Sequence, residues 1–317
     1  MSSLLLPIPH EPSSSEIAAK AAAKAGLIQL GGRPPLLTYL RELWHRRHFA
    51  FELANSRFRS QNEATRLGIA WVVLTPMINA AVYGFVFGIL MPSSSRPKHF
   101  LPFLVVGVFS FAFFSGCFAD GAKSIVSNRG LVRTLHFPRA VLPIATVIQK
   151  LLELAAMTFV MVLIMLLSGE PPTLRWLRIF PAFFLMALFC SGVAFFAARM
   201  TIHIRDIQQL IPFITRLIFY VSGIFYAVGK KFNGRGELGT VLKANPLNVY
   251  ITLVRDALLT RDRIVHVKGA NGLYHATGAD GIAANITTWE LAAGYGIVLF
   301  VTGFLFFWRA EGLYGRD

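Results

Sequence analysis

The sequence predicts an all-α polytopic membrane protein of about six transmembrane helices, preceded by an amphipathic interfacial helix. Of its 317 residues, 55% are hydrophobic and only 15% are charged, too few charges to cover a soluble domain of this length. The hydrophobic residues gather in runs long enough to cross a bilayer, which takes about 20 residues in a helix. These runs do not alternate polar and apolar residues, so they predict helices and exclude the strands of a membrane barrel.

Two segments precede the first apolar run. Residues 1–35 are rich in Ser, Ala, Pro and Gly and show no cleavable signal peptide, so they predict a disordered cytoplasmic tail. Residues 36–65 predict an amphipathic helix region. Between Leu36 and Phe51, leucines and a tryptophan occupy one helical face, and Arg, Glu and His residues largely occupy the other. The position before a run favours a helix in the membrane interface over an ordinary cytoplasmic helix.

Six apolar runs predict the transmembrane helices, the first five within residues 66–228 and the sixth within residues 290–317. The runs are Leu67–Leu90, Phe100–Ala119, Val141–Leu167, Ile179–Ala198, Leu210–Val228 and Leu291–Trp308.

The formal net charge of +15 is distributed as expected for a membrane protein. Lys and Arg gather before the first run and in the second and fourth connections, which the positive-inside rule assigns to the cytoplasm. Both termini then lie in the cytoplasm. The connection 229–289 carries eight Lys or Arg, but at about 60 residues it is too long for the rule to hold strictly. This distribution favours contact with membrane lipids and argues against a nucleic-acid partner.

Two connections predict helices of their own. The second connection predicts a short cytoplasmic helix near residues 127–136, ended by Pro138, which cannot continue it. In the external loop, 229–289, the apolar stretch Leu247–Leu259 is too short to span and predicts a re-entrant or interfacial helix. The Gly- and Ala-rich segment Lys268–Asn285 that follows predicts a flexible insertion.

The sequence shows no motif for catalysis or metal binding. Residues 116–124 look like a phosphate loop, but Ala122 separates the glycine from Lys123, so we expect no ATPase in this chain. No His, Cys, Asp or Glu residues have convincing metal-ligand spacing, and both cysteines fall inside apolar runs as small buried residues. We therefore expect no catalytic residue, no metal and no cofactor bound by this chain.

Ionisable residues inside the apolar runs are few. Lys150 and Glu153 are three residues apart on one helix and predict a structural ion pair. Arg216 has no acidic residue within one turn, so it either faces a polar cavity, where it can meet a phosphate group, or reaches toward the cytoplasmic edge. An ion-coupled carrier would need more acidic residues near the midplane, so the energy for transport is expected from another chain.

Four groups of residues, in order along the chain, resemble one family. They are Arg57-Phe58 with Leu67-Gly68-x-x-Trp71-x-x-Leu74-x-Pro76 and Phe87-Gly88; Phe137-Pro138-Arg139 with Leu142-Pro143; Arg205-Asp206-Ile207 with Phe219-Tyr220-x-Ser222-Gly223-Ile224-x-Tyr226; and Asn245-Pro246-Leu247 with Arg255. From Phe51 to the C-terminus, the chain resembles the permease subunits of ABC exporters for polysaccharides, O-antigen and teichoic acid (ABC type-2 permeases). It looks most like actinobacterial permeases that export lipid-linked galactan. Gly223 stands where the family often has proline, which affects a local kink.

This resemblance implies half of a transporter in the bacterial cytoplasmic membrane. It further implies that two copies form a homodimer and that each docks one separate ABC ATPase subunit, which would hold the ATP and Mg²⁺. The substrate implied is a lipid-diphosphate-linked polysaccharide, such as galactan, that moves outward. The segment that docks the ATPase comprises Ser127, Asn128, Arg129, Leu131, Val132, Arg133 and His136.

Two further groups of side chains fit such a function. Arginines at the cytoplasmic entrance can receive a diphosphate headgroup, or can equally anchor the chain to the membrane surface. These are Arg57, Arg59 and Arg66. Aromatic residues suit sugar rings, although each one alone is more often a packing or lipid-facing residue. The candidates for the channel lining are Tyr83, Phe113, Phe114, Arg216, Phe219, Tyr220 and Tyr226.

Two alternatives stay open on sequence alone. A membrane enzyme of lipid-linked sugar metabolism predicts turnover by the chain alone that depends on Asp120 or Asp206. An ion-driven carrier predicts transport that collapses with the proton gradient while ATP is held constant.

Overall fold

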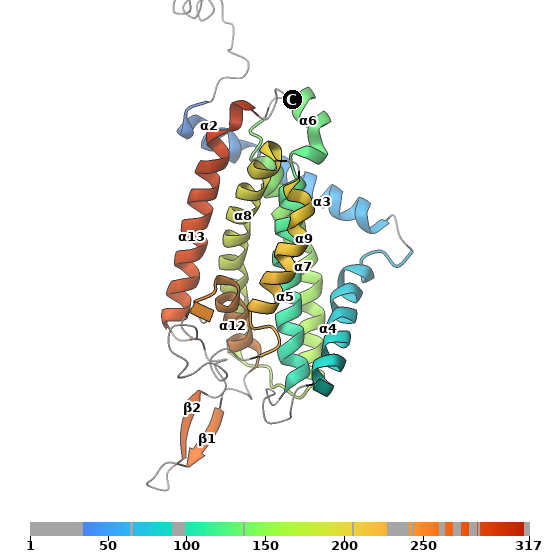
Figure 1. The fold of residues 1–317 in the computed structure, drawn as a ribbon, viewed down its shortest axis with the longest axis vertical. Coiled ribbons are helices and arrows are strands. Elements are labelled where there is room, and N and C mark those ends of the chain that lie inside the picture. The colour runs from blue at the N-terminus through green and yellow to red at the C-terminus, as the bar shows by residue number, and fades with distance from the viewer. Residues whose placement is uncertain are drawn as a thin grey trace, which may run out of the picture.

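The computed structural model describes residues 34–63, 66–90, 99–135, 137–204, 206–226, 241–242, 244–259, 264–268, 274–278, 284 and 286–313. Five helices in this part of the chain are long and apolar enough to cross a membrane, and they run side by side along the long axis of the molecule (Figure 1). They are α4 (Ala70–Leu90), α5 (Phe100–Lys123), α7 (Val141–Leu167), α8 (Ile179–His203) and α13 (Ile286–Arg309). The prediction of an all-α polytopic membrane protein is confirmed.

The predicted apolar runs match these helices closely. Helix α7 has both of its predicted ends. Helices α5, α8 and α13 extend up to five residues beyond the predicted runs. The runs contain only the apolar residues that match the bilayer core, and a helix can continue through the polar residues that flank it. Helix α4 begins at Ala70 and not at Leu67, because a turn with Gly68 at φ 52 precedes it.

The fifth predicted run is only partly correct. Helix α9 (Ile207–Val221) has 15 residues, so it extends about 22 Å at the usual rise per residue, less than the bilayer core. It ends at Ser222, and Gly223 follows with φ 66, a left-handed conformation that commonly terminates helices. The prediction that the helix continues to Val228 is therefore wrong at Gly223, and residues 227 and 228 lie outside the described residues.

One end of the bundle carries α2 (Leu36–His45), α3 (Arg47–Glu63) and α6 (Arg129–Thr134), beside the end of α13 (Figure 1). We call it the α6 end. The single helix predicted from Leu36 to Phe51 is divided into two helices at Arg46. The backbone of Arg46 is not in the regular helical conformation. Helix α6 follows a 3-10 turn, Val126–Asn128, and Leu135 after it is extended. This agrees with the predicted short helix and break.

The opposite end carries α12 (Pro246–Leu258) and a β-hairpin (Figure 1). Asn245 caps α12 by accepting the Leu247 backbone N–H at 3.0 Å, and the bounds agree with the predicted re-entrant helix. Strands β1 (Ile264–Lys268) and β2 (Tyr274–Gly278) pair antiparallel, with Ile264 opposite Gly278. Within the insertion predicted for Lys268–Asn285, residues 274–278 form β2 and pair with a segment that precedes the insertion or begins it, while the flexibility of the insertion stays a prediction.

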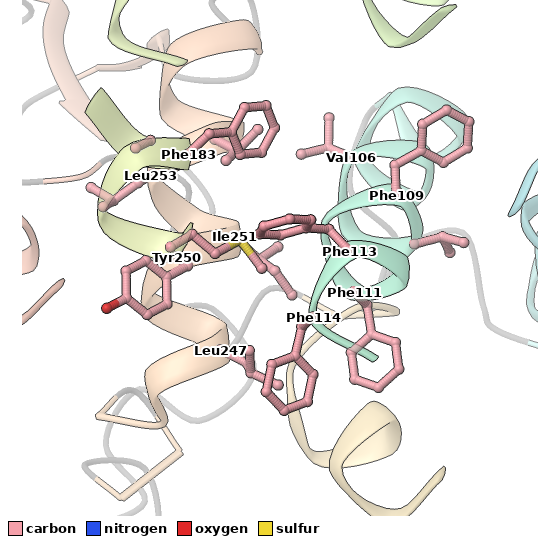
Figure 2. Close-up of a cluster of buried hydrophobic side chains, with 14 of the residues drawn as sticks. Val106, Phe109, Phe111, Phe113, Phe114, Phe183, Leu247, Tyr250, Ile251 and Leu253 are labelled. Atoms are coloured by element: carbon pink, nitrogen blue, oxygen red, sulfur yellow. The ribbon is translucent and has the colours of Figure 1, made fainter. Parts of the chain in front are cut away.

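The hydrophobic core is built around α5. Its buried side chains pack against α7, α8 and the re-entrant helix α12. In Figure 2, Phe113 lies between α5 and Ile251 of α12. Helices α8 and α13 approach so closely that a Cβ on Gly192 would overlap the Leu299 carbonyl. This side of the molecule is a closely packed scaffold.

Candidate functional site

A cavity of about 520 Å³ lies between α4, α5, α7 and α9. Its wall from α5 is a single helical face, on which Val108, Ser115 and Ala119 recur at helical spacing. The polar lining consists of hydroxyl and amide side chains that can hydrogen-bond a ligand, namely Thr75, Asn79, Ser115 and Thr215. The volume and this mixture of groups are typical of a small-molecule binding site.

The aromatic wall of the cavity is made by Tyr83, Phe111 and Phe219. The Phe219 ring lies 5.1 Å from the Tyr83 ring and 4.8 Å from the Phe111 ring, centroid to centroid. Phe225 supports this wall from the segment after α9, 5.2 Å from Phe219. Of the predicted lining residues, Tyr83, Phe219 and Arg216 therefore meet at the cavity. Phe111 was missed.

Other predicted lining residues lie elsewhere. Phe113 and Phe114 are 1% and 4% exposed and belong to the hydrophobic core, where Phe113 points toward Ile251 of α12 and Phe114 lies beside Phe111 (Figure 2). They do not line this cavity, and their place in a channel lining stays a prediction. Tyr220 is 49% exposed on the outside of α9, and the Tyr226 hydroxyl donates to the Tyr220 carbonyl at 3.3 Å.

A charged cluster forms the part of the cavity wall contributed by α7. The Lys150 ammonium lies 2.9 Å from Glu153, which confirms the predicted pair, and 2.8 Å from Asp120 of α5. Gln149 donates to Glu153 at 3.3 Å and to Gln61 of α3 at 2.8 Å. The sequence did not indicate Asp120 as a partner, because the contact joins two helices. With two carboxylates around one ammonium, the cluster carries a formal charge of −1.

Arg216 is the second cation of the cavity. It lines the wall from α9, in the same cavity as Tyr83. In the part of the chain that the structure describes, it forms no hydrogen bond or ion pair. Of the two alternatives for Arg216, the structure therefore places it at the polar cavity, with its donors available to an anion.

The predicted docking segment lies at the α6 end. Ser127, Arg129 and Arg133 are exposed, Leu131 is half-buried, and Val132 packs into a cluster with Tyr39 of α2. His136 lies outside the described residues. The segment thus presents basic and hydroxyl groups outward and packs on the bundle through Val132, with Leu131 partly buried against the same cluster.

The three predicted headgroup arginines lie in different surroundings. Arg57 is partly buried on α3 and donates to Asn128 at 3.0 Å and to Thr146 of α7 at 3.3 Å. Burial lowers the pKa of Arg57, partly offset by the charge of Asp120. Arg59 and Arg66 are exposed. Arg57 therefore ties α3 to the docking segment and to α7, while the other two remain accessible.

Groups for metal or redox chemistry are scarce in the described ranges. No cluster of three or more His, Cys, Asp or Glu residues there could hold a metal ion. Cys117 and Cys190 are both buried and free.

Comparison with known proteins gives consistent matches. The family model described as ABC-2 type transporter matches residues 51–259. The O-antigen export system permease protein RfbA of Klebsiella pneumoniae is 24% identical over 211 residues, 65% of this chain and 78% of the relative. RfbA of Myxococcus xanthus is 25% identical over 67% of this chain and 80% of its own. The polysialic acid transport protein KpsM of Escherichia coli is 25% identical over 61% and 74%.

Proposed function

The chain belongs to the ABC-2 type transporter family, and on this premise we propose that it is the permease subunit of an ATP-driven polysaccharide exporter. Membership makes it the membrane part of a transporter and not an enzyme in its own right. In our proposal, two copies form the channel and a separate ABC ATPase binds each copy. The relatives named as O-antigen export permeases and as a polysialic acid transport protein support a polysaccharide substrate.

The cavity between α4 and α9 is the observation that carries this proposal. These two helices are the least covered of its walls: 17% of the most apolar stretch of α4 is buried, against 72% in α5, and the buried residues of α9 are Ile211 and Phe219. Apolar side chains along α4 face outward, among them Val82, Phe85 and Ile89. A second copy that covers this side would close two cavities into one pathway, which supports a homodimer.

The lining suits a glycan attached to a phosphate-bearing lipid. Aromatic faces of Tyr83, Phe111 and Phe219 can stack on sugar rings, and the nearby hydroxyl and amide groups can bond sugar hydroxyls. Arg216 offers a fork of donors to a phosphate group. Arg59, on α3, and Arg66, between α3 and α4, are exposed and would meet the headgroup first. We propose a lipid-diphosphate-linked substrate on these grounds, with galactan as the first to test.

The orientation follows from charge. Basic residues concentrate at the α6 end, so this end would face the cytoplasm of a bacterial inner membrane and both termini would lie there. The exposed Ser127, Arg129 and Arg133 are then in position to contact the ATPase.

Purification of the tagged chain from its native host tests the proposal. We expect a P-loop ATPase to copurify and the complex to hydrolyse ATP. The variant L131D should leave hydrolysis in place and lower export by about tenfold or more, since an unpaired charge in an interface costs more than the 1.4 kcal/mol of one decade. The control L174D places the same change at an exposed leucine outside the docking segment, just before α8.

Recovery of the chain alone, with no ATPase, would contradict the proposal. Normal export by L131D with a bound ATPase would instead contradict only the docking assignment.

A further inference from the structure

Three segments far apart in the sequence meet at one buried carboxylate at the α6 end. Glu311, in the 3-10 turn after α13, is 6% exposed and accepts hydrogen bonds from the Tyr39 hydroxyl (2.8 Å) and the Arg139 backbone N–H (3.0 Å). The Tyr39 oxygen in turn accepts the Ala140 backbone N–H at 3.1 Å. The Arg139 guanidinium donates back to the Glu311 carbonyl. We call Tyr39, Arg139, Ala140 and Glu311 the clasp.

The clasp caps helix α7 from outside. The N–H groups of Arg139 and Ala140 stand directly before Val141, the first residue of α7, and no side chain of Ala140 can cap them. Tyr39 and Glu311 satisfy them instead, and the negative charge of Glu311 lies at the positive end of the helix dipole. The position of α7 is therefore tied to α2 and to the end of α13.

The Glu311 carboxylate is held at both of its oxygens, one by the Tyr39 hydroxyl and the other by the Arg139 backbone N–H. Burial raises the pKa of the Glu311 carboxyl, and these two hydrogen bonds act in the opposite direction. A side chain fixed in this way between two distant segments favours a role in positioning.

The clasp is coupled mechanically to α6. Only a short connection separates Thr134, at the end of α6, from Arg139. Val132 of α6 packs in the same apolar cluster as Tyr39 and Ala140. Across the connection, the Phe137 ring meets the Phe49 ring of α3 edge to face at 5.5 Å. Contacts on both sides of this connection therefore link the position of α6 to that of α7.

We propose that Tyr39 and Glu311 are positioning residues that transmit movement of the docking segment to α7, and so set how much export each ATP hydrolysed produces. This rests on the proposed function, in which α6 contacts the ATPase. Both residues lie outside residues 51–259, the part matched by the family model. Helix α7 also carries Lys150 and Glu153, so its movement would change the cavity wall directly.

The test compares variants in the native host, with the full-length tagged chain purified together with its ATPase. Export is measured as carbohydrate released from the surface of washed cells, and is divided by the ATP hydrolysis of the purified complex. We expect E311A and Y39F each to lower this ratio by about fivefold or more, since each removes two hydrogen bonds of the clasp and one net hydrogen bond corresponds to about fivefold. E311Q should give a ratio between those of the wild type and E311A, because its amide oxygen can still accept from Arg139 but its amide nitrogen cannot accept the Tyr39 hydroxyl.

Matched controls separate this role from a general loss of packing. Y295F removes a hydroxyl that donates to the Ala244 carbonyl at 2.8 Å, away from the α6 end, and E290A removes an exposed carboxylate on α13. Neither should change the ratio. An unchanged ratio in Y39F, or an equal loss in Y295F, overturns the proposal. If the wild-type chain brings down no ATPase, the proposed function fails instead, and the two failures are distinguishable.

Discussion

The two sides of the helix bundle are built in different ways. On the side of α5, α8 and α13, buried side chains and closely approaching backbones leave little room, as at Gly192, where α8 meets Leu299 of α13. On the side of α4 and α9, few side chains are buried, and a cavity lies where the other side has a packed core. In α4, a Cβ on Gly88 would meet nothing within 4 Å.

This difference assigns separate tasks to the two sides. The closely packed side can hold its shape while the other side changes, because packed interiors resist gradual deformation. Arg255 fixes the packed side at the end opposite the α6 end. It is 2% exposed and donates to the carbonyls of Phe103, Gly223 and Ile224. Since Gly223 and Ile224 follow α9, Arg255 also anchors the more open side at one end.

Replacement of Arg255 should have the largest effect. R255M leaves the Gly223 and Ile224 carbonyls without their donor, at about 1–3 kcal/mol each, so we expect little folded protein. Yield of monodisperse protein and thermal unfolding in detergent measure this. G107A should produce a milder form of the same defect, because its Cβ would lie 2.7 Å from the Arg255 guanidinium. Wild-type stability in R255M would show that the two sides are not joined here.

Gly192 tests the packed side alone. G192A drives a Cβ into the backbone of α13, so we expect destabilisation of about 1–3 kcal/mol, as in other overpacked cores. The matched control is G294A on α13, where a Cβ meets nothing within 4 Å. The midpoint of thermal unfolding compares them. Equal midpoints would mean that the close approach of α8 and α13 is not required.

The more open side should show the smallest effect on folding and a clear effect on association. V82C places a thiol on the exposed face of α4, and a bifunctional thiol reagent should join two copies through it with unfolding unchanged. F159C, on an exposed position of α7, is the control and should give a monomer band on the same gel. Crosslinking of F159C but not V82C would place the contact between copies elsewhere.

Apolar run length determined which helices could be predicted. The bounds of α7 and the short helix α12 follow from lipid-matched length and from the Asn-Pro start of α12. The end of α9 was missed because apolar residues continue past Gly223. The Gly223 carbonyl, where the helix has ended, accepts a hydrogen bond from Arg255, 32 residues later. Local sequence does not contain that contact.

The candidate site was harder to predict than the fold. In a helix that is apolar on all sides, such as α5, periodicity does not distinguish the face of Phe111 from that of Phe113. The Lys150 and Glu153 pair was predictable from spacing on one helix, whereas Asp120 was not. Tyr39 and Glu311 are 272 residues apart, so only the folded chain brings them together.

The most direct test of the account is transport in inverted membrane vesicles from the native host, in which the endogenous lipid-linked glycan has been radiolabelled. With ATP held constant and a protonophore present, we expect labelled glycan to enter the vesicle lumen at the undisturbed rate. Removal of ATP should stop entry. Entry that collapses with the proton gradient while ATP remains would contradict an ATP-driven permease and establish an ion-driven carrier in its place.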